Sequence, residues 1–416
     1  MTDLPPRIEL LPLKAALPMG LDGETTVLVR IRPLDLPPQD GPRPPLNLAL
    51  VIDRSGSMSG HPLAMARKAT QVGLRKLEAQ DRVSVVIFDD EVELLVPSQP
   101  AENIEHLCRV VEGITDGGST ALHAGWLDGA MQVAGHLNPQ ALNRVLLLSD
   151  GHANVGKRRV QEIVPDVAGL TKRGVSTSTI GLGTGYDEDL LRGMAVAGDG
   201  NFEHIEDPEQ LPRYFDAEFS ALSRTTGHTV SLGIEPNPAL GSLRQEVLND
   251  LARNDLGRYQ LPNLMAGQPI EIVLTLHVPA QPQGVDLGIT RVRLAWTGRD
   301  GVRRKMRAQL NLPVVSGEAY DLLPENEEVR LALELQRNAR AKRDAVDRLD
   351  AGDVLGAQRV LRSRREVFGL VAPAPAFLRS QELDELADLE RNVAGDANVA
   401  RKRAASQSFD RSRSKR

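Results

Sequence analysis

The sequence predicts an α/β protein, with a doubly wound domain inserted next to a β-sandwich and an α-helical segment after them. Three stretches of the 416-residue chain support this fold class. Strand-like apolar runs alternate with helical periodicity over residues 46–223, strand-like alternation dominates residues 224–316, and apolar residues recur at helical spacing over residues 317–395. We therefore expect three structured regions, flanked by residues 1–45 and 396–416.

The first region has the pattern of a parallel sheet with helices on both faces. Its first strand, Leu46–Asp53 (LNLALVID), is apolar at almost every position, as expected for a strand that is covered on both faces. Further strands are predicted at 83–88, 92–96, 144–149, 176–181 and 201–205, and helices at 59–79, 102–112, 122–137, 160–173, 187–197 and 208–222. Because strands alternate with helices, we expect right-handed crossovers and a doubly wound sheet.

The N-terminal strand has no partner close to it in the sequence. Residues 24–35 (ETTVLVRIRPLD) alternate β-branched residues with mostly polar neighbours, which is the period of a half-buried strand. Five prolines between residues 37 and 45 then predict a linker. We expect residues 1–45 to join the β-sandwich of residues 224–316, so that the α/β domain is an insertion whose two ends lie close together.

Four strands are predicted for the sandwich, at 229–234, 270–278, 285–296 and 302–314, with a hairpin turn at 297–301 (TGRDG). The third region is predicted to contain helices at 325–351, 354–369 and 378–392. Residues 396–416 have no apolar periodicity and many Arg, Lys and Ser residues, so they are predicted to form a disordered basic tail.

Composition narrows the functional classes. Aromatic residues make up only 3% of the chain, which argues against base-stacking surfaces for single-stranded nucleic acid. The single cysteine, Cys108, excludes an internal disulfide framework and a Cys-rich zinc site. The proline-broken N-terminus lacks the apolar core of a signal peptide, and no stretch approaches the ~20 apolar residues of a membrane span. We therefore expect a cytoplasmic protein.

Five oxygen-bearing side chains stand at the ends of predicted strands and turns. Asp53, Ser55 and Ser57 follow the first strand at alternating positions, which places three oxygens on one side of an extended turn. Thr120 ends the turn Asp-Gly-Gly-Ser-Thr before a predicted helix, and Asp150 follows another apolar strand. The carboxyl ends of parallel strands converge on the crevice where open α/β folds bind ligands. Oxygen donors suit a hard cation, so we predict a site for Mg²⁺, with Ca²⁺ or Mn²⁺ as alternatives.

This pattern resembles the von Willebrand factor A domain and its metal-ion-dependent adhesion site, written Asp-x-Ser-x-Ser with a distant Thr and Asp. Residues 81–90 (DRVSVVIFDD) and 179–191 (TIGLGTGYDEDLL) are also similar to strands and turns of that family. The resemblance covers about residues 46–222. It implies a Rossmann-like fold, contacts of the five residues to the ion directly or through water, and one coordination position that takes an acidic side chain of a partner. The flanking regions are similar in layout to bacterial and plant proteins of the family.

Other motifs match known sites less well. Residues 151–157 (GHANVGK) fit a phosphate-binding loop, but Arg158 stands where Mg²⁺ needs Ser or Thr. The glycines of residues 181–185 (GLGTG) lie too close together for a dinucleotide fingerprint and predict a turn. Ser57 could be proposed as a nucleophile, but Met58 stands where a hydrolase elbow requires serine.

The histidines and serines near the predicted site also have structural interpretations. His61, His123 and His152 match no zinc spacing, and we expect surface or loop histidines, of which His152 lies nearest to Asp150 in the sequence. Ser55 and Ser57 could merely cap the helix that follows. Capping alone does not explain why the other three oxygen-bearing residues accompany them.

Three functions remain open from the sequence. The first is a non-enzymatic, metal-dependent scaffold that binds an Asp or Glu of a partner protein. The second is a metal-assisted hydrolase that uses the same ion, although no base or nucleophile stands out. The third is a nucleic-acid-associated protein that acts through the basic tail, whose cations are Arg401, Lys402, Arg403, Arg411, Arg413, Lys415 and Arg416.

Overall fold

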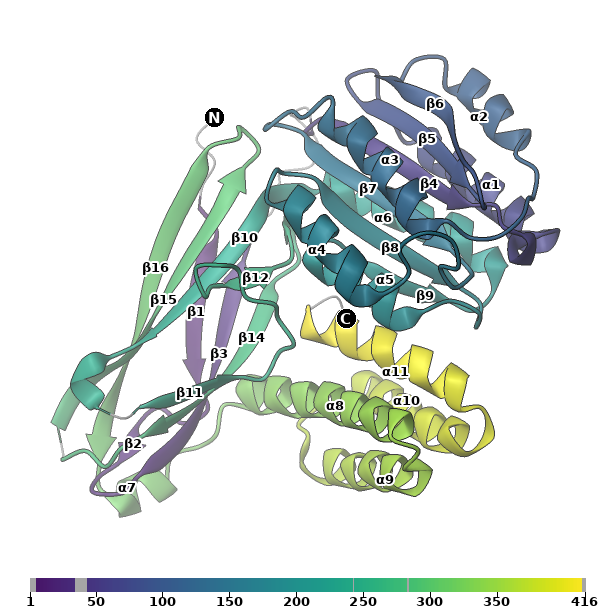
Figure 1. Cartoon of the computed structure of the whole chain (residues 1–416). Coiled ribbons are helices and arrows are strands. Elements are labelled where there is room, and N and C mark those ends of the chain that lie inside the picture. Colours follow the sequence, from purple (N-terminus) through teal and green to yellow (C-terminus); the bar gives the residue numbers. More distant parts are fainter. Residues whose placement is uncertain (1–4, 34–42, 242, 283, 414–416) are drawn as a thin grey trace. The chain divides into compact units, whose positions relative to one another are not determined.

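A computed structural model describes residues 5–33, 43–241, 243–282 and 284–413, so most of the predicted proline linker lies outside the described residues. The chain forms two compact units. One contains residues 1–35, 229–296 and 303–416, and the other contains residues 36–228 and 297–302. The predicted fold class is confirmed, because one unit is doubly wound α/β and the other combines β-sheets with a C-terminal group of helices (Figure 1).

The α/β unit contains a six-stranded sheet in the order β6-β5-β4-β7-β8-β9. Its strands are β4 (Leu46–Asp53), β5 (Arg82–Phe88), β6 (Val92–Pro100), β7 (Leu142–Ser149), β8 (Ser176–Leu182) and β9 (Phe202–Ile205). All neighbours pair in parallel except β5 and β6, which are antiparallel. The chain moves outward from β4 to β5 on one side and to β7 on the other, so the direction of winding reverses at β4. Open α/β sheets bind ligands at the carboxyl ends of strands at such a switch point.

Helices cover both faces of this sheet (Figure 1). They are α1 (His61–Leu74), α2 (Ile104–Glu112), α3 (Leu122–Ala134), α4 (Val160–Thr171), α5 (Glu188–Ala197) and α6 (Leu211–Ser223). On one face, Leu48 and Leu50 of β4 share a core with α1 and α6. On the other, Val51 lies against α3, where a Cβ added to Gly129 would be only 2.4 Å from Val51 Cγ2. Coverage of both faces explains the continuous apolar run of β4.

Two sheets of the other unit share one apolar core. The first has the order β1 (Arg7–Pro12), β3 (Gly23–Arg32), β14 (Ile270–Val278), β11 (Arg244–Val247). The second has the order β12 (Tyr259–Leu261), β10 (Thr225–Pro236), β15 (Gly284–Gly298), β16 (Arg303–Val315), β2 (Leu17–Pro18), with β13 (Leu264–Met265) paired to β10. Strand β3 pairs antiparallel with β14 from Gly23 opposite Val278 to Ile31 opposite Ile270. The N-terminal segment therefore completes a sheet whose other strands follow the α/β unit in the sequence.

The helices of this unit are α7 (Gly317–Asp321), α8 (Glu327–Asp350), α9 (Val354–Val371), α10 (Ala376–Gly395) and α11 (Ala397–Ser412). Val329 and Leu333 of α8 pack against Leu28 of β3 and Val273 of β14. This contact joins the helices to the outer face of one sheet. None of the helices in the described ranges has the length and hydropathy needed to cross a bilayer.

The prediction of a disordered basic tail is wrong, because residues 397–412 form helix α11. Asp396 caps its N-terminus by accepting hydrogen bonds from the Asn398 and Val399 amides, both at 3.1 Å. Ala400 and Ala404 then pack into a core that includes Leu386 of α10. The missed signal is this Ala-Ala pair at a spacing of four, which buries too little apolar surface to stand out among the surrounding charges.

The basic residues of α11 are bound within the protein. Arg401 Nε lies 2.8 Å from Asp350 Oδ1, and Arg411 pairs with Glu382. The side-chain amide of Gln336 also donates to the Arg411 carbonyl at 3.0 Å. Charge compensation and backbone contacts therefore hold a segment whose composition resembles that of a disordered chain.

We predict that Ala404→Asp will release α11 from the helical group, because an unpaired carboxylate buried in an apolar core costs ~3 kcal/mol or more. Hydrogen–deuterium exchange of residues 397–412 should become at least ~10-fold faster. Ala397→Asp is the matched control, since Ala397 is exposed at the start of the same helix. Equal exchange in wild type and Ala404→Asp would contradict the packing of α11.

Candidate metal centre

Three loops at one edge of the α/β sheet carry the five predicted ligands. Asp53 is the last residue of β4, Ser55 directly precedes the short 3-10 turn Gly56–Met58 that follows, and Ser57 lies within that turn. Thr120 precedes α3, and Asp150 directly follows β7. Since β4 and β7 are parallel neighbours, their carboxyl ends, and hence these loops, meet at the switch point of the sheet.

The side-chain oxygens of these residues lie close together. Ser55 Oγ and Ser57 Oγ are 3.2 Å apart, and Ser57 Oγ donates to Asp150 Oδ1 at 2.6 Å. Asp53 Oδ1 accepts the Ser55 amide at 2.8 Å. A Cβ added to Gly151 would lie 3.4 Å from Thr120 Oγ1 and 3.5 Å from Ser57 Oγ, which places the threonine hydroxyl beside the others. The structure thus brings all five predicted residues to one place.

The first loop does not have the geometry of a helix cap. Ser55 precedes the 3-10 turn without a side-chain capping hydrogen bond, and the residue before α1 is Gly60. The hydroxyls of Ser55 and Ser57 point instead to each other and to Asp150. Helix capping therefore does not account for the two serines.

The Asp53 carboxylate is fully buried. Burial raises the pKa of Asp53 to about 6, although hydrogen bonds from Ser149 and Ser55 act in the opposite direction. Burial also raises the pKa of Asp150. Neither carboxylate forms an ion pair with a Lys, Arg or His side chain of the described residues. The site therefore holds two carboxylates whose charge only neutral donors offset.

Ser149 is a site residue that the sequence did not single out. Its hydroxyl donates to Asp53 Oδ2 at 2.5 Å, so both oxygens of this carboxylate have a donor from the protein. Ser149 is the last residue of β7, next to Asp150, and is fully buried. Its position one residue before the strand-end aspartate was the available signal.

Asp89 and Asp90, which follow β5, hold the loop that leads to Thr120. Asp89 Oδ2 lies 3.1 Å from Arg54 Nε of the first loop, and its carbonyl accepts the Ala121 amide at 2.6 Å. A Cβ on Gly117 would lie 1.7 Å from Asp89 Oδ2, and one on Gly118 would lie 2.0 Å from Asp90 Oδ1. Only glycine at both positions lets the loop backbone approach these carboxylates.

Backbone hydrogen bonds join the same loops directly. The Gly117 amide donates to the Arg54 carbonyl at 2.8 Å, and the Gly56 amide donates to the Gly118 carbonyl at 2.9 Å. Asn154, in the loop after Asp150, accepts the Thr120 amide on Oδ1 at 2.7 Å. Each loop is therefore held by another one, and the five oxygens do not depend on a single flexible segment.

The nearby histidines do not enter this cluster. His123 Nε2 lies 2.9 Å from Asp166 Oδ2, and His61 Nε2 lies 3.4 Å from Glu209 Oε1. His152 is exposed. Lys157, the lysine of the phosphate-loop match, pairs with Asp166 at 2.6 Å. The histidines and this lysine thus contact carboxylates on helices or face solvent.

A cation at this site would depend on hydroxyl oxygens. The described part of the chain contains no cluster of three or more His, Cys, Asp and Glu side chains arranged for a metal. Asp53 and Asp150 supply two negative charges, and Ser55, Ser57 and Thr120 supply neutral oxygens. That donor set suits a hard cation such as Mg²⁺, which retains water ligands and needs few carboxylates. The residues present therefore fit a divalent cation.

Comparisons with known proteins agree with the fold. The family model described as the von Willebrand factor type A domain matches residues 47–217. An uncharacterized protein of Synechocystis is 28% identical over 57% of this chain and 58% of its own length. Human inter-alpha-trypsin inhibitor heavy chain H3 is 30% identical over 50% of this chain and 24% of its own length. The chain thus spans less than two thirds of the length of either relative.

A solved structure extends the likeness to the whole chain. The von Willebrand factor type A protein from Catenulispora acidiphila aligns with a TM-score of 0.72, covering 100% of this chain and 98% of the other at 17% identity. At that identity the likeness concerns the fold alone. Together with the sheet order and the family match, it leads to one conclusion: residues 47–217 form a von Willebrand factor type A domain.

Proposed function

We propose that the type A domain holds Mg²⁺ in a metal-ion-dependent adhesion site and uses it to bind an Asp or Glu of a partner protein. The observation that carries this proposal is the pair of carboxylates, fully buried Asp53 and half-buried Asp150, which no cationic side chain of the described residues offsets. Two carboxylates and three hydroxyls leave room on an octahedral ion for water or for a ligand from outside.

Each residue of the site has a distinct task in this proposal. The hydroxyls of Ser55, Ser57 and Thr120 are the candidates for ligation, and the two carboxylates supply the charge, directly or through water. When bound, the ion supplies a strong electrostatic attraction for one more carboxylate in a partly dry site. Ser149 keeps Asp53 oriented through its 2.5 Å hydrogen bond, and Asn154 keeps Thr120 oriented through the backbone.

The side chains near the five oxygen-bearing residues favour partner binding over hydrolysis. A hydrolase needs a base placed to accept a proton from water or a nucleophile. Of the candidate bases near these loops in the sequence, His123 and Lys157 are engaged by Asp166, and His152 is exposed to solvent. Nucleic-acid binding through the C-terminal residues is disfavoured for a similar reason, since Arg401 and Arg411 pair with carboxylates of the helical group.

The first test is metal binding by the purified protein. Titration calorimetry with Mg²⁺ and Mn²⁺ should give one site in the wild type. Asp53→Asn and Thr120→Ala should each weaken affinity by ~10-fold or more. Ser119→Ala is the matched control, because Ser119 is exposed on the same loop. Wild-type affinity in Asp53→Asn would overturn the assignment of the site.

The second test concerns the partner. A pull-down should be run with the wild type and with Asp53→Ala, each in Mg²⁺ and in chelator. Partners of the site should be retained only by the wild type in Mg²⁺, because either change removes the ion that holds the partner's carboxylate. A partner retained in chelator and by Asp53→Ala would show that binding does not use the metal.

A third prediction concerns the pH dependence of stability without metal. The folded protein holds Asp53 with a pKa of about 6, above its ordinary value, so it binds this proton more tightly than the unfolded chain does. The contribution of protonated Asp53 to the free energy of unfolding is then fully present below about pH 4. It is lost as the pH rises through 6, and the total loss is ~3 kcal/mol.

Urea unfolding in chelator can measure this loss. Between pH 4 and pH 7 the wild type should lose stability relative to Asp53→Asn, which has no carboxylate to ionise. Excess Mg²⁺ at pH 7 should stabilise the wild type more than Asp53→Asn, which binds the ion more weakly. A constant difference between the two proteins across this range would contradict the burial of an uncompensated carboxylate.

A further inference from the structure

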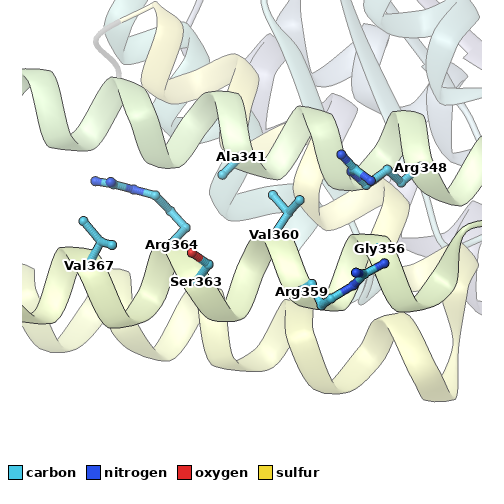
Figure 2. A pocket seen from close by; sticks show the side chains of 8 residues that line it. All are labelled: Ala341, Arg348, Gly356, Arg359, Val360, Ser363, Arg364 and Val367. Atoms are coloured by element: carbon cyan, nitrogen blue, oxygen red, sulfur yellow. The ribbon is translucent and has the colours of Figure 1, made fainter.

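A groove on the outer side of the helical group lies between α8 and α9. It has a volume of about 460 Å³, and Ala341 of α8 and Val360 of α9 lie between the two helices (Figure 2). Val367 continues the lining along α9, and Arg348, Arg359 and Arg364 also border the groove. We propose that this groove is a docking site for an acidic amphipathic helix of a partner protein.

The apolar surface of α9 extends well beyond the groove. Leu355 is 71% exposed, Val367 40%, Leu370 85% and Val371 49%. At about 100° per residue, these side chains share one half of the helix with Val360. Three of the four buried residues of α9, Ala357, Leu361 and Phe368, occupy the other half, and the fourth, Gly356, has no side chain to expose.

No described element covers this exposed half of α9. The interior half packs with Leu386 and Leu389 of α10 and with Ala345 of α8 in one core. That packing leaves the stripe from Leu355 to Val371 facing outward. Arg359, Ser363 and Glu366 are exposed on the same half, so polar side chains alternate with the apolar ones, as on an amphipathic docking face. Folded proteins seldom expose several large apolar side chains together on one helix face unless something binds there.

The charge of the groove indicates the sign of the charge that a partner should carry. Helix α9 carries four arginines and one glutamate. Arg364 is engaged by Glu334 and Asn338, and Arg348 by Asp344 and Asp353, at 3.0 and 3.1 Å.

Arg359 is the exception in this groove. It is exposed and makes no ion pair with any described residue, and the closest contact of its Nε is the Leu355 carbonyl at 3.4 Å. The Asp353 carboxylate acts on Arg359 without forming an ion pair with it, and the residues that line the groove include three arginines and no carboxylate. A partner that fills the groove and carries a carboxylate opposite Arg359 would complement both its apolar floor and its charge.

The shape of the groove favours a helix as the occupant. Helices α8 and α9 form a hairpin through the turn at Gly352, whose φ is +77°. Ala341 is small and leaves room for side chains of a third helix, whereas the space beside Gly356 is filled by the Asp353 carboxylate, 1.8 Å from where a Cβ would lie. The stripe from Leu355 to Val371 is roughly 25 Å long, which corresponds to about four turns of helix. A second copy of this chain would bring the same cationic face, so like charges would oppose self-association.

The test uses the full-length protein and two labelled synthetic helical peptides of about 18 residues, long enough to match the stripe. Both peptides present leucine at positions i, i+3, i+4 and i+7, and they differ only in carrying Glu or Lys beside that stripe. By fluorescence anisotropy the Glu peptide should bind more tightly than the Lys peptide, and more weakly as salt increases. Arg359→Glu should reverse this preference, because it places a carboxylate where the Glu peptide needs a cation.

The apolar floor is tested separately from the charge. Val367→Ser combined with Leu370→Ser should weaken binding of the Glu peptide by ~10-fold or more. Leu322→Ser is the matched control, since Leu322 is 85% exposed but lies outside the groove. All three variants change exposed residues, and circular dichroism should give wild-type helix content for each.

Four outcomes would overturn the proposal. The first is that neither peptide binds up to millimolar concentration, and the second is that both bind equally. The third is that the Val367 and Leu370 double variant binds the Glu peptide as the wild type does. The fourth is that the wild type self-associates in sedimentation and the double variant does not. The surface would be assigned to an anionic membrane instead if the wild type bound phosphatidylglycerol vesicles, the double variant did not, and neither peptide was preferred.

Discussion

The buried carboxylate of Asp53 is the constraint around which the α/β unit is organised. A charged group with no access to water needs either a counter-charge or several hydrogen-bond donors. Here the Ser55 amide and the Ser149 hydroxyl occupy one oxygen each, and no cation of the described chain approaches. Neutral donors reduce the cost of burial without removing the charge. The carboxyl edge of β4 therefore remains attractive to a cation from solution.

The burial of Asp53 at that edge follows from the packing of β4. Alternate residues of the strand face opposite layers of helices, so Leu50 contributes to one core and Val51 contacts α3 on the other side. The close approach of α3 depends on Gly129, and it places the start of the helix, and Thr120 before it, over the end of β4. The packing of the sheet and the assembly of the site are thus one arrangement, in which the helix that covers the strand also positions Thr120, a proposed ligand.

The sequence predicted the groups of this site but not what holds them. Asp53, Thr120 and Asp150 could be identified from the sequence because each stands at the end of a predicted strand or before a predicted helix. Asp89 and Asn154 act through backbone amides and carbonyls, and such contacts depend on loop paths that no periodicity encodes. The predictions also identified the long strands of the second unit, such as β14 and β15, and missed short ones such as β11, whose four residues are too few to establish alternation.

The error over residues 397–412 has a physical lesson that bears on both proposed sites. A segment rich in cations looks like a binding tail when its charges are counted alone, but Arg401 and Arg411 have counter-charges inside the protein. Net charge is therefore a poor guide to recognition, and a charge left without its counter-charge is a better one. By that criterion the type A domain offers a buried negative site, which calls for a divalent cation. The groove of α8 and α9 offers the Arg359 guanidinium, which forms no ion pair with a described residue, beside an apolar floor, and we propose a carboxylate on a helix as its counterpart. The two surfaces differ in sign and in chemistry, so a single acidic partner would need the metal at one and not at the other.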